Sequence, residues 1–199
     1  GYLPVDQELE SKRQKLEVAL WHLSQISPIS EPQFTPIKDE NWMDAWKAHY
    51  QPVPIGQNLL ILPAWAQPEA NKSRTTIRIN PAMAFGTGTH PTTQLCLQLL
   101  EKHIRPDIKV IDVGCGSGIL SIAALKFGAA QVLAVDVDRQ AVNATLENTG
   151  INDLKWGVLE TGKGSVNEIR AGQFTIQEAP LVMVNILASI IIDLFGEGL

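Results

Sequence analysis

The sequence predicts an α/β protein built on a doubly wound, mostly parallel sheet. Three short and almost wholly apolar runs, at residues 109–113, 131–136 and 181–187, have the length and composition of strands buried on both faces. Segments with helical spacing follow them, and a glycine-rich stretch, DVGCGSG at 112–118, directly follows the first run. Strands and helices that alternate at this spacing predict βαβ units with right-handed crossovers, and hence a Rossmann-like architecture.

The composition narrows the class of protein. With 199 residues, 45% of them hydrophobic, the chain is long enough for one domain, or for one domain and a fragment. Its net charge of −5 gives no electrostatic reason for direct contact with nucleic acid, and we expect none. Two cysteines make no disulfide framework, which fits a reducing compartment. We find no signal peptide and no apolar run long enough to span a membrane, so we expect a cytoplasmic protein without membrane contact.

The first 50 residues predict a helix, a linker and a second helix. Residues 9–23 carry apolar side chains at helical spacing, and we interpret them as a helix that packs on its own domain. The polar segment after it holds three prolines and is typical of a linker. Asn41 then caps a helix in which Trp42 and Trp46 lie one turn apart, an arrangement typical of packing.

The next part of the chain predicts two strands and a helix. Residues 51–65 and 75–80 have the pattern of short strands with a loop between them. Pro91 begins a helix that runs to about His103. The side chains of this helix that we expect to face inward are Leu95, Leu99 and Leu100.

The remaining elements follow the first buried strand in order. An apolar helix at 119–127 is ended by Gly128. Asp138 caps a second helix, at 139–148. Residues 154–160 predict a weak third strand, and the strong strand at 181–187 follows.

The spacing of the glycines discriminates between ligands. From residue 114 to 118 the pattern is G-x-G-x-G, and Ile119 stands where a dinucleotide fingerprint needs its third glycine. No Lys-Ser/Thr pair follows, so the loop is not a P-loop. The pattern favours a ligand that ends in a carboxylate and an amine and has no phosphate, such as S-adenosylmethionine. A nicotinamide-dependent oxidoreductase is disfavoured.

Several polar residues lie around this loop. Asp136, at the end of the second strand, can accept hydrogen bonds from both ribose hydroxyls of such a ligand; a turn or capping role is the alternative, for which Asp138 is better placed. Asp112 either bonds the N–H groups of the glycine loop or meets the ligand amine. Cys115 has no adjacent base that would make it a nucleophile. His90 has either a structural role at its helix start or a chemical one. The four histidines have no ligand-like spacing, and we expect no metal.

Three stretches together resemble the bacterial ribosomal protein L11 methyltransferase (PrmA) family. They are NPAMAFGTGTHPTT at 80–93, VIDVGCGSGILSIAALKFGA at 110–129 and VNILA at 184–188. The segment NWMDAWKAHYQPVPIG also resembles the linker helix of that family and the strand after it. The resemblance implies a class I methyltransferase fold. It also implies S-adenosylmethionine-dependent methylation of amino groups, on lysine side chains and the N-terminal amine, in a large-subunit ribosomal protein.

The resemblance also implies cofactor contacts at residues in the matching motifs. These residues are Thr93, Gly114, Asp136 and Asn185; we also expect Phe85 and Gly116 to contact the cofactor. Thr93 would offer a hydroxyl and a helix N-terminal N–H to the cofactor carboxylate. Phe85 would lie across the ligand, and Gly86 and Gly88 would let this segment move as a lid.

Asn185 is the residue for which we expect a catalytic role. Its side-chain oxygen could accept an N–H bond from the substrate amine and aim the lone pair of the nitrogen at the methyl group, which is catalysis by positioning. The alternative is a buried polar residue at a strand end, bonded to backbone.

The resemblance leads to a division of the chain that we predict as follows. Residues 1–30 are the remnant of an N-terminal substrate-recognition domain, residues 31–50 are a linker with its helix, and residues 51–199 are the methyltransferase domain, incomplete at its C-terminus. We thus expect a monomer that is a fragment of a longer protein, truncated at both ends. The alternatives are a cofactor-binding fragment without turnover, or a methyltransferase that acts on another protein or on a small-molecule amine.

Overall fold

The computed structural model describes residues 8–26, 32–35, 52–66, 73–80 and 86–199, together with Leu3, Asp6 and Ser30. The chain divides into two compact units, residues 1–49 and residues 50–199. The expected helix with Trp42 and Trp46, and the expected ligand contact at Phe85, lie outside the described residues. None of the described helices is both long and apolar enough to cross a membrane.

In the first unit, helix α1 (Leu9–Ser24) forms where the apolar spacing predicts it. Arg13 pairs with Glu17 one turn further along, with Nε and a carboxylate oxygen 3.0 Å apart, and such pairs support an exposed helix. None of the side chains of α1 is buried, and Trp21 is 60% exposed. The expected packing of this helix on its own domain is therefore not seen among the described residues.

A small sheet begins the second unit. Its strands are β1 (Val53–Ile55), β2 (Leu59–Pro63) and β3 (Thr75–Ile79). They lie in the order β1-β2-β3, with β1 antiparallel to β2 and β2 parallel to β3. The two segments in which the sequence predicted strands contain all three: β1 and β2 lie within residues 51–65, and β3 lies within residues 75–80.

The main sheet has four parallel strands in the order β6-β5-β4-β7. They are β4 (Lys109–Val113), β5 (Gln131–Asp136), β6 (Leu159–Lys163) and β7 (Leu181–Val184). The chain moves outward from β4 to β6 and then returns to place β7 on the other side of β4. This reversal confirms the predicted doubly wound, parallel architecture.

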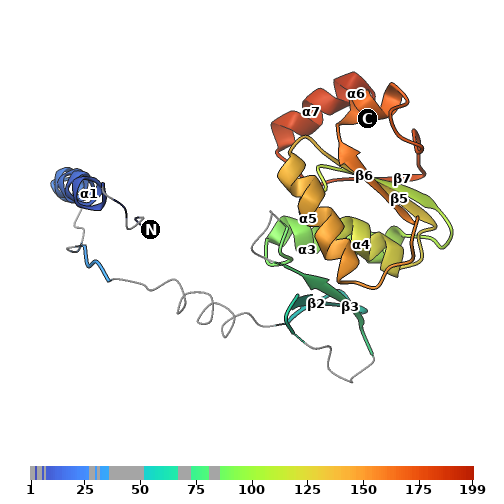
Figure 1. Ribbon diagram of the computed structural model, residues 1–199, viewed down its shortest axis with the longest axis horizontal. Coiled ribbons are helices and arrows are strands. Elements are labelled where there is room, and N and C mark those ends of the chain that lie inside the picture. The colour runs from blue at the N-terminus through green and yellow to red at the C-terminus, as the bar shows by residue number, and fades with distance from the viewer. Residues whose placement is uncertain are drawn as a thin grey trace. The chain divides into compact units, whose positions relative to one another are not determined.

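Helices cover both faces of the main sheet (Figure 1). The helices are α3 (Pro91–His103), α4 (Ile119–Lys126), α5 (Arg139–Gly150), α6 (Val166–Arg170) and α7 (Ala188–Glu197). Val110 of β4 packs in one cluster with α3, α4 and the small sheet, whereas the next residue, Ile111, packs with α6 and α7 on the other face. The alternation follows from the pleat of the strand, and it explains why these strands are apolar at nearly every position.

The third strand of the main sheet begins later than predicted. The structure places it at Leu159–Lys163, whereas the sequence predicted residues 154–160. Gly157 has a φ of +78° and Trp156 is fully exposed, so this part of the chain turns through solvent before the strand begins. The short helix α6 was not predicted, although its capping box, Ser165 with Glu168, is visible in the sequence.

The inward face of α3 also differs from the prediction. Its buried residues are Thr93, Leu97 and Leu100, at the i, i+4, i+7 spacing of one helix face. Leu95 and Leu99 lie on the opposite face and are 58% and 57% exposed. The prediction was correct for Leu100 and wrong for the other two leucines.

The two faces of α3 should respond differently to truncation. We expect Leu97→Ala to lower the free energy of unfolding by about 2–5 kcal/mol, because it leaves a cavity in the core. Leu99→Ala, on the exposed face, should change it by no more than about 0.5 kcal/mol. Urea unfolding of both variants measures the difference, and equal losses would place the buried face of α3 elsewhere.

Candidate functional site

The register of the parallel strands brings three predicted site residues to one edge of the sheet. Val113 of β4 pairs with Val135 of β5 on one side and with Val184 of β7 on the other. The residues that follow these three are Gly114, Asp136 and Asn185. They stand side by side at the carboxyl ends of neighbouring strands, where the strand order reverses, and this is where open α/β sheets bind ligands.

The turn after β4 has a backbone that only glycine adopts readily. Gly114, Gly116 and Gly118 have φ angles of +78°, +55° and +79°. A Cβ atom added at Gly114 would overlap Cγ2 of Ile186, and one added at Gly118 would lie 2.9 Å from Cγ2 of Thr145. The loop is therefore held tightly between β7 and α5, and its glycines serve both the turn and this close approach.

Asp136 holds the glycine loop from the neighbouring strand. Its carboxylate accepts the N–H of Gly116 at 3.0 Å and the N–H of Asp138 at 2.9 Å. Asp138 itself caps α5 by accepting the N–H of Gln140, as predicted. Each oxygen of the Asp136 carboxylate can accept a second hydrogen bond, so contact with ribose hydroxyls stays a prediction.

Asp112 is buried beneath the loop, with only 1% of its surface exposed. Its Oδ2 accepts the hydroxyl of Ser121, in the first turn of α4, at 2.6 Å, whereas Oδ1 is buried and has no hydrogen-bond partner among the described residues. Burial raises the pKa of this carboxyl to about 6, against the opposing effect of the Ser121 hydrogen bonds. Of the two roles expected for Asp112, hydrogen bonding to the N–H groups of the loop is not observed.

Cys115 behaves as the small, unreactive residue that the sequence predicted. It is buried, and desolvation raises the pKa of its thiol to about 12, with a smaller contribution from the Asp112 charge. The sulfur lies 3.3 Å from the hydroxyl oxygen of Thr145 on α5. A thiol with so high a pKa is not a nucleophile at neutral pH.

The glycine-rich segment before α3 is joined to the loop after β4. The hydroxyl of Ser117 donates to the carbonyl of Gly86 at 2.7 Å. Gly86 and Gly88 have φ angles of +100° and +86°. A Cβ atom at Gly86 would lie 2.9 Å from Oγ of Ser117, and one at Gly88 would lie 3.1 Å from Ile61. The two glycines are thus required by backbone conformation and close packing, and a moving lid stays a prediction.

At the start of α3, His90 has the structural role that the sequence allowed. Its ring nitrogen Nδ1 accepts the N–H of Thr92 at 3.3 Å and makes a 2.8 Å hydrogen bond with the Thr92 hydroxyl. His90 is thereby the N-cap of the helix, and Pro91 opens the first turn.

Thr93 and Asn185, 92 residues apart in sequence, contact each other. Nδ2 of Asn185 donates to the hydroxyl oxygen of Thr93 at 3.3 Å. Thr93 is fully buried. Because Thr93 is buried, we favour a role in which it holds the Asn185 side chain in place. Direct contact of Thr93 with a cofactor stays a prediction. The alternative for Asn185, a side chain bonded only to backbone, does not describe this contact.

A metal site and a second ligand cavity are two other kinds of site that the described part of the chain could hold. No three His, Cys, Asp or Glu residues gather there in a way that could hold a metal ion. An open cavity of about 470 Å³ lies between the small sheet and the ends of α3 and α4, away from the glycine loop. Two charged residues of its wall hold the turn between β1 and β2: Arg74 donates to three backbone carbonyls there, and Glu101 accepts two backbone N–H groups.

Sequence reasoning missed two polar residues that support the loop. Thr145 donates to the carbonyl of Gly116 at 3.0 Å, and Asn148 donates to the carbonyl of Ser117 at 2.8 Å. Both are buried. Their i, i+3 spacing puts two polar side chains on the inward face of α5, and this signal was available in the sequence.

A family model and the similar proteins all concern ribosomal protein L11 methyltransferases. The family model for ribosomal protein L11 methyltransferase (PrmA) matches residues 1–197. The chain is 39% identical over 199 residues to the ribosomal protein L11 methyltransferase of Symbiobacterium thermophilum. It is 44% identical over 194 residues to that of Prochlorococcus marinus strain MIT 9313.

These matches cover 99% and 96% of this chain but 63% and 64% of the two relatives, so the chain spans less than two thirds of their length. A crystal structure of a ribosomal protein L11 methylase from Lactobacillus delbrueckii subsp. bulgaricus is also similar. Its TM-score is 0.63 at 35% sequence identity, and the match covers 74% of this chain and 72% of that chain.

The crowding at Gly114 predicts a difference between two glycines with the same φ. Gly157 also has a φ of +78° but has nothing within 4 Å of an added Cβ atom. We expect Gly157→Ala to cost about 1–2 kcal/mol of stability, from backbone strain alone. Gly114→Ala should cost about 1–3 kcal/mol more, because Ile186 must move. Urea unfolding compares the two variants, and equal losses would argue against a packed loop.

The raised pKa of Asp112 predicts a pH dependence of stability. A carboxyl whose pKa is higher in the folded than in the unfolded state binds its proton more tightly on folding, so its contribution is present below about pH 4 and lost as the pH rises through about 6. Asp112→Asn removes this effect and keeps an acceptor for Ser121. Relative to wild type, the variant should gain about 3 kcal/mol of unfolding free energy between pH 4 and 7. Urea unfolding across this range measures the difference in unfolding free energy between the variant and wild type. A difference that does not change with pH would contradict the prediction.

Proposed function

Because the chain belongs to the ribosomal protein L11 methyltransferase (PrmA) family, we propose that the protein transfers methyl groups from S-adenosylmethionine to amino groups of ribosomal protein L11. The groups that we propose as acceptors are lysine side chains and the N-terminal amine. The reaction takes place in the cytoplasm, and the enzyme acts as a monomer.

The observation that carries this proposal is the convergence of three distant motifs at one edge of the sheet. Asn185 follows β7, Gly114 follows β4 beside it, and Thr93 of α3 contacts Asn185 at 3.3 Å. Ser117 connects the glycine loop to Gly86 of the segment before α3. The motifs that distinguish this family in sequence thus border a single site.

The groups around the glycine loop fit the amino-acid end of S-adenosylmethionine. Oδ1 of Asp112 is a buried acceptor without a partner among the described residues, which suits an ammonium group. The first turn of α3, a helix of thirteen residues, carries the positive end of the helix dipole, which suits a carboxylate. Asp136, one strand away, has acceptor capacity left for the ribose hydroxyls.

The cofactor supplies a methyl group that a positively charged sulfur makes electrophilic, and the protein must provide a neutral, aligned amine. A lysine amine has an unperturbed pKa of about 10.4 and must lose its proton first; desolvation in the site lowers that pKa. Asn185 then orients the amine. Its Nδ2 is held by Thr93, which leaves the side-chain oxygen to accept an N–H bond from the amine.

This chemistry is positioning, without a covalent intermediate on the enzyme. The cysteine nearest the site, Cys115, is buried and its pKa is raised to about 12, so it offers no thiolate. Holding the amine and the methyl group in line is enough to account for a large part of the rate, since alignment alone lowers the barrier by several kcal/mol, up to about 7–11 kcal/mol.

A methyl-transfer assay tests the proposal. Incubation of the protein with methyl-labelled S-adenosylmethionine and unmodified ribosomal protein L11 should place label on L11. Asn185→Ala should lower the rate constant by about 100-fold, because a misaligned amine reacts slowly, with a smaller change in cofactor Kd. Asn143→Ala, an exposed asparagine on α5, is the matched control and should react like wild type.

The results separate the alternatives. Cofactor binding without any label on L11 would support a cofactor-binding protein without turnover. Label on another protein or on a small amine, with none on L11, would show that the substrate is that protein or amine instead of L11. Failure to bind S-adenosylmethionine at all would overturn the proposal.

A further inference from the structure

Asn148 of α5 is a fully buried polar side chain that the proposed reaction does not use. Its Nδ2 donates to the carbonyl of Ser117 at 2.8 Å, and its Oδ1 accepts the N–H of Asn80, also at 2.8 Å. Both partners are backbone groups, and they belong to segments far apart in the sequence. One amide group therefore connects the glycine loop after β4 to Asn80, the residue that directly follows β3.

Ser117 makes a second connection to the same part of the chain. Its hydroxyl donates to the carbonyl of Gly86 at 2.7 Å, and it also accepts the N–H of Ile119. Asn80 and Gly86 are thus both attached to Ser117, the first through Asn148 and the second directly. Residues 86–90, which lead into α3 and so to Thr93, are attached to the glycine loop by the Ser117 hydroxyl, and Asn80 is attached to it by Asn148.

The same helix holds two consecutive carbonyl groups of the loop. Thr145, three residues before Asn148, donates to the carbonyl of Gly116 at 3.0 Å, and Asn148 donates to the next one, that of Ser117. With both carbonyls bonded to α5, these peptide groups cannot rotate to turn an oxygen toward an anionic ligand. The orientation of the loop backbone therefore depends on donors from α5.

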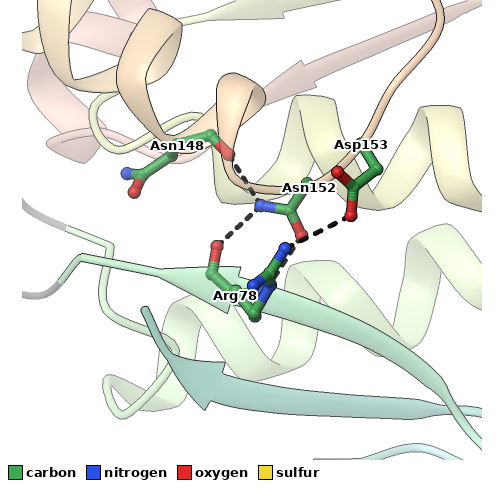
Figure 2. Close-up of polar contacts among 4 residues, drawn as sticks. All are labelled: Arg78, Asn148, Asn152 and Asp153. Carbon is green, nitrogen blue, oxygen red and sulfur yellow. Dashed lines mark hydrogen bonds and ion pairs between the residues drawn. The ribbon is translucent and has the colours of Figure 1, made fainter. Parts of the chain in front are cut away.

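Asn152, one turn further on, makes a similar bridge that does not involve the loop (Figure 2). Its Nδ2 donates to the carbonyls of Arg78 and of Asn148, both at 2.7 Å, and its Oδ1 accepts the N–H of Arg78 at 2.9 Å. Arg78 is in β3, at an edge of the small sheet, where this amide takes the place of a neighbouring strand. The guanidinium of Arg78 also pairs with Asp153 at 3.3 Å.

We propose that Asn148, through Ser117, is a positioning residue for cofactor binding: its amide sets the glycine loop, relative to Asn80 and to residues 86–90 before α3, in the placement that the cofactor requires. The inference rests on the proposed function, since it takes the ligand of this loop to be S-adenosylmethionine. Asn148 touches neither the cofactor nor the substrate. It acts through the backbone of two segments that we propose to contact the cofactor, the glycine loop and residues 86–90.

Asn148→Asp breaks one half of the bridge and keeps the other. A carboxylate oxygen still accepts the N–H of Asn80, but the second oxygen faces the carbonyl of Ser117 and cannot donate to it. We expect the Kd for S-adenosylmethionine, measured by calorimetry at pH 8, to rise roughly 10- to 100-fold. A protonated carboxyl can donate again, so the ratio of variant Kd to wild-type Kd should shrink as the pH is lowered toward 5.

Asn152→Asp is the matched control. It replaces another buried amide, in the turn that follows α5, and removes two donated hydrogen bonds, but its partners are Arg78 and the Asn148 backbone. We expect it to lower the unfolding temperature at least as much as Asn148→Asp does. Its Kd for S-adenosylmethionine should stay within about threefold of wild type, with no dependence of the ratio on pH.

The outcomes separate the inference from the proposed function. Absence of cofactor binding by the wild-type protein would overturn both. Wild-type binding together with an unchanged Kd for Asn148→Asp would overturn the inference alone, and so would an equal weakening by Asn152→Asp. If Asn148→Asp does not fold, Asn148→Ala tests the same bridge, because it removes both hydrogen bonds of the amide without adding a charge; a raised Kd supports the inference and an unchanged Kd refutes it.

Discussion

The pairing of Val113 with Val135 on one side and Val184 on the other is the constraint on which the site depends. In a parallel sheet the strands end at the same edge, so this register sets the three following residues side by side. Gly114 begins the glycine loop, Asp136 supplies an acceptor-only carboxylate, and Asn185 supplies an amide. A slip of one residue in any of these strands would exchange its buried faces and separate the three groups.

The register alone would leave the loop and the segment before α3 unattached to each other, and polar side chains make that connection. Asn185 reaches Thr93, Ser117 reaches Gly86, and Asn148 joins Ser117 to Asn80. Because Thr93, Ser117 and Asn148 are buried, their polar groups must find partners inside the protein, and these partners hold the segments together. The site is therefore defined by an apolar sheet underneath and by a small set of buried hydrogen bonds above it.

Much of this was predictable from local pattern. The strands at 109–113 and 131–136 and the helix at 91–103 have the predicted bounds, because buried parallel strands and capped helices carry strong local signals. The prediction was weakest where tertiary contacts decide. Leu95 and Leu99 lie on an apolar stripe of α3 that the fold leaves exposed, whereas Leu97 is the leucine that reaches the core. Similarly, a turn at Gly157 delays β6, which the apolar content of residues 154–160 did not indicate.

The sequence by itself determined the class of fold, the family and the residue types at the edge of the sheet, since these follow from hydrophobic periodicity, glycine spacing and short motifs. Only the tertiary structure decided which polar groups meet. The contact between Thr93 and Asn185, the burial that raises the pKa of Asp112, and the bridge made by Asn148 all join segments far apart in sequence or depend on what surrounds them. Local pattern places a side chain on a face of its own element, but the packing of several elements sets its neighbours, its exposure to water and hence its chemistry.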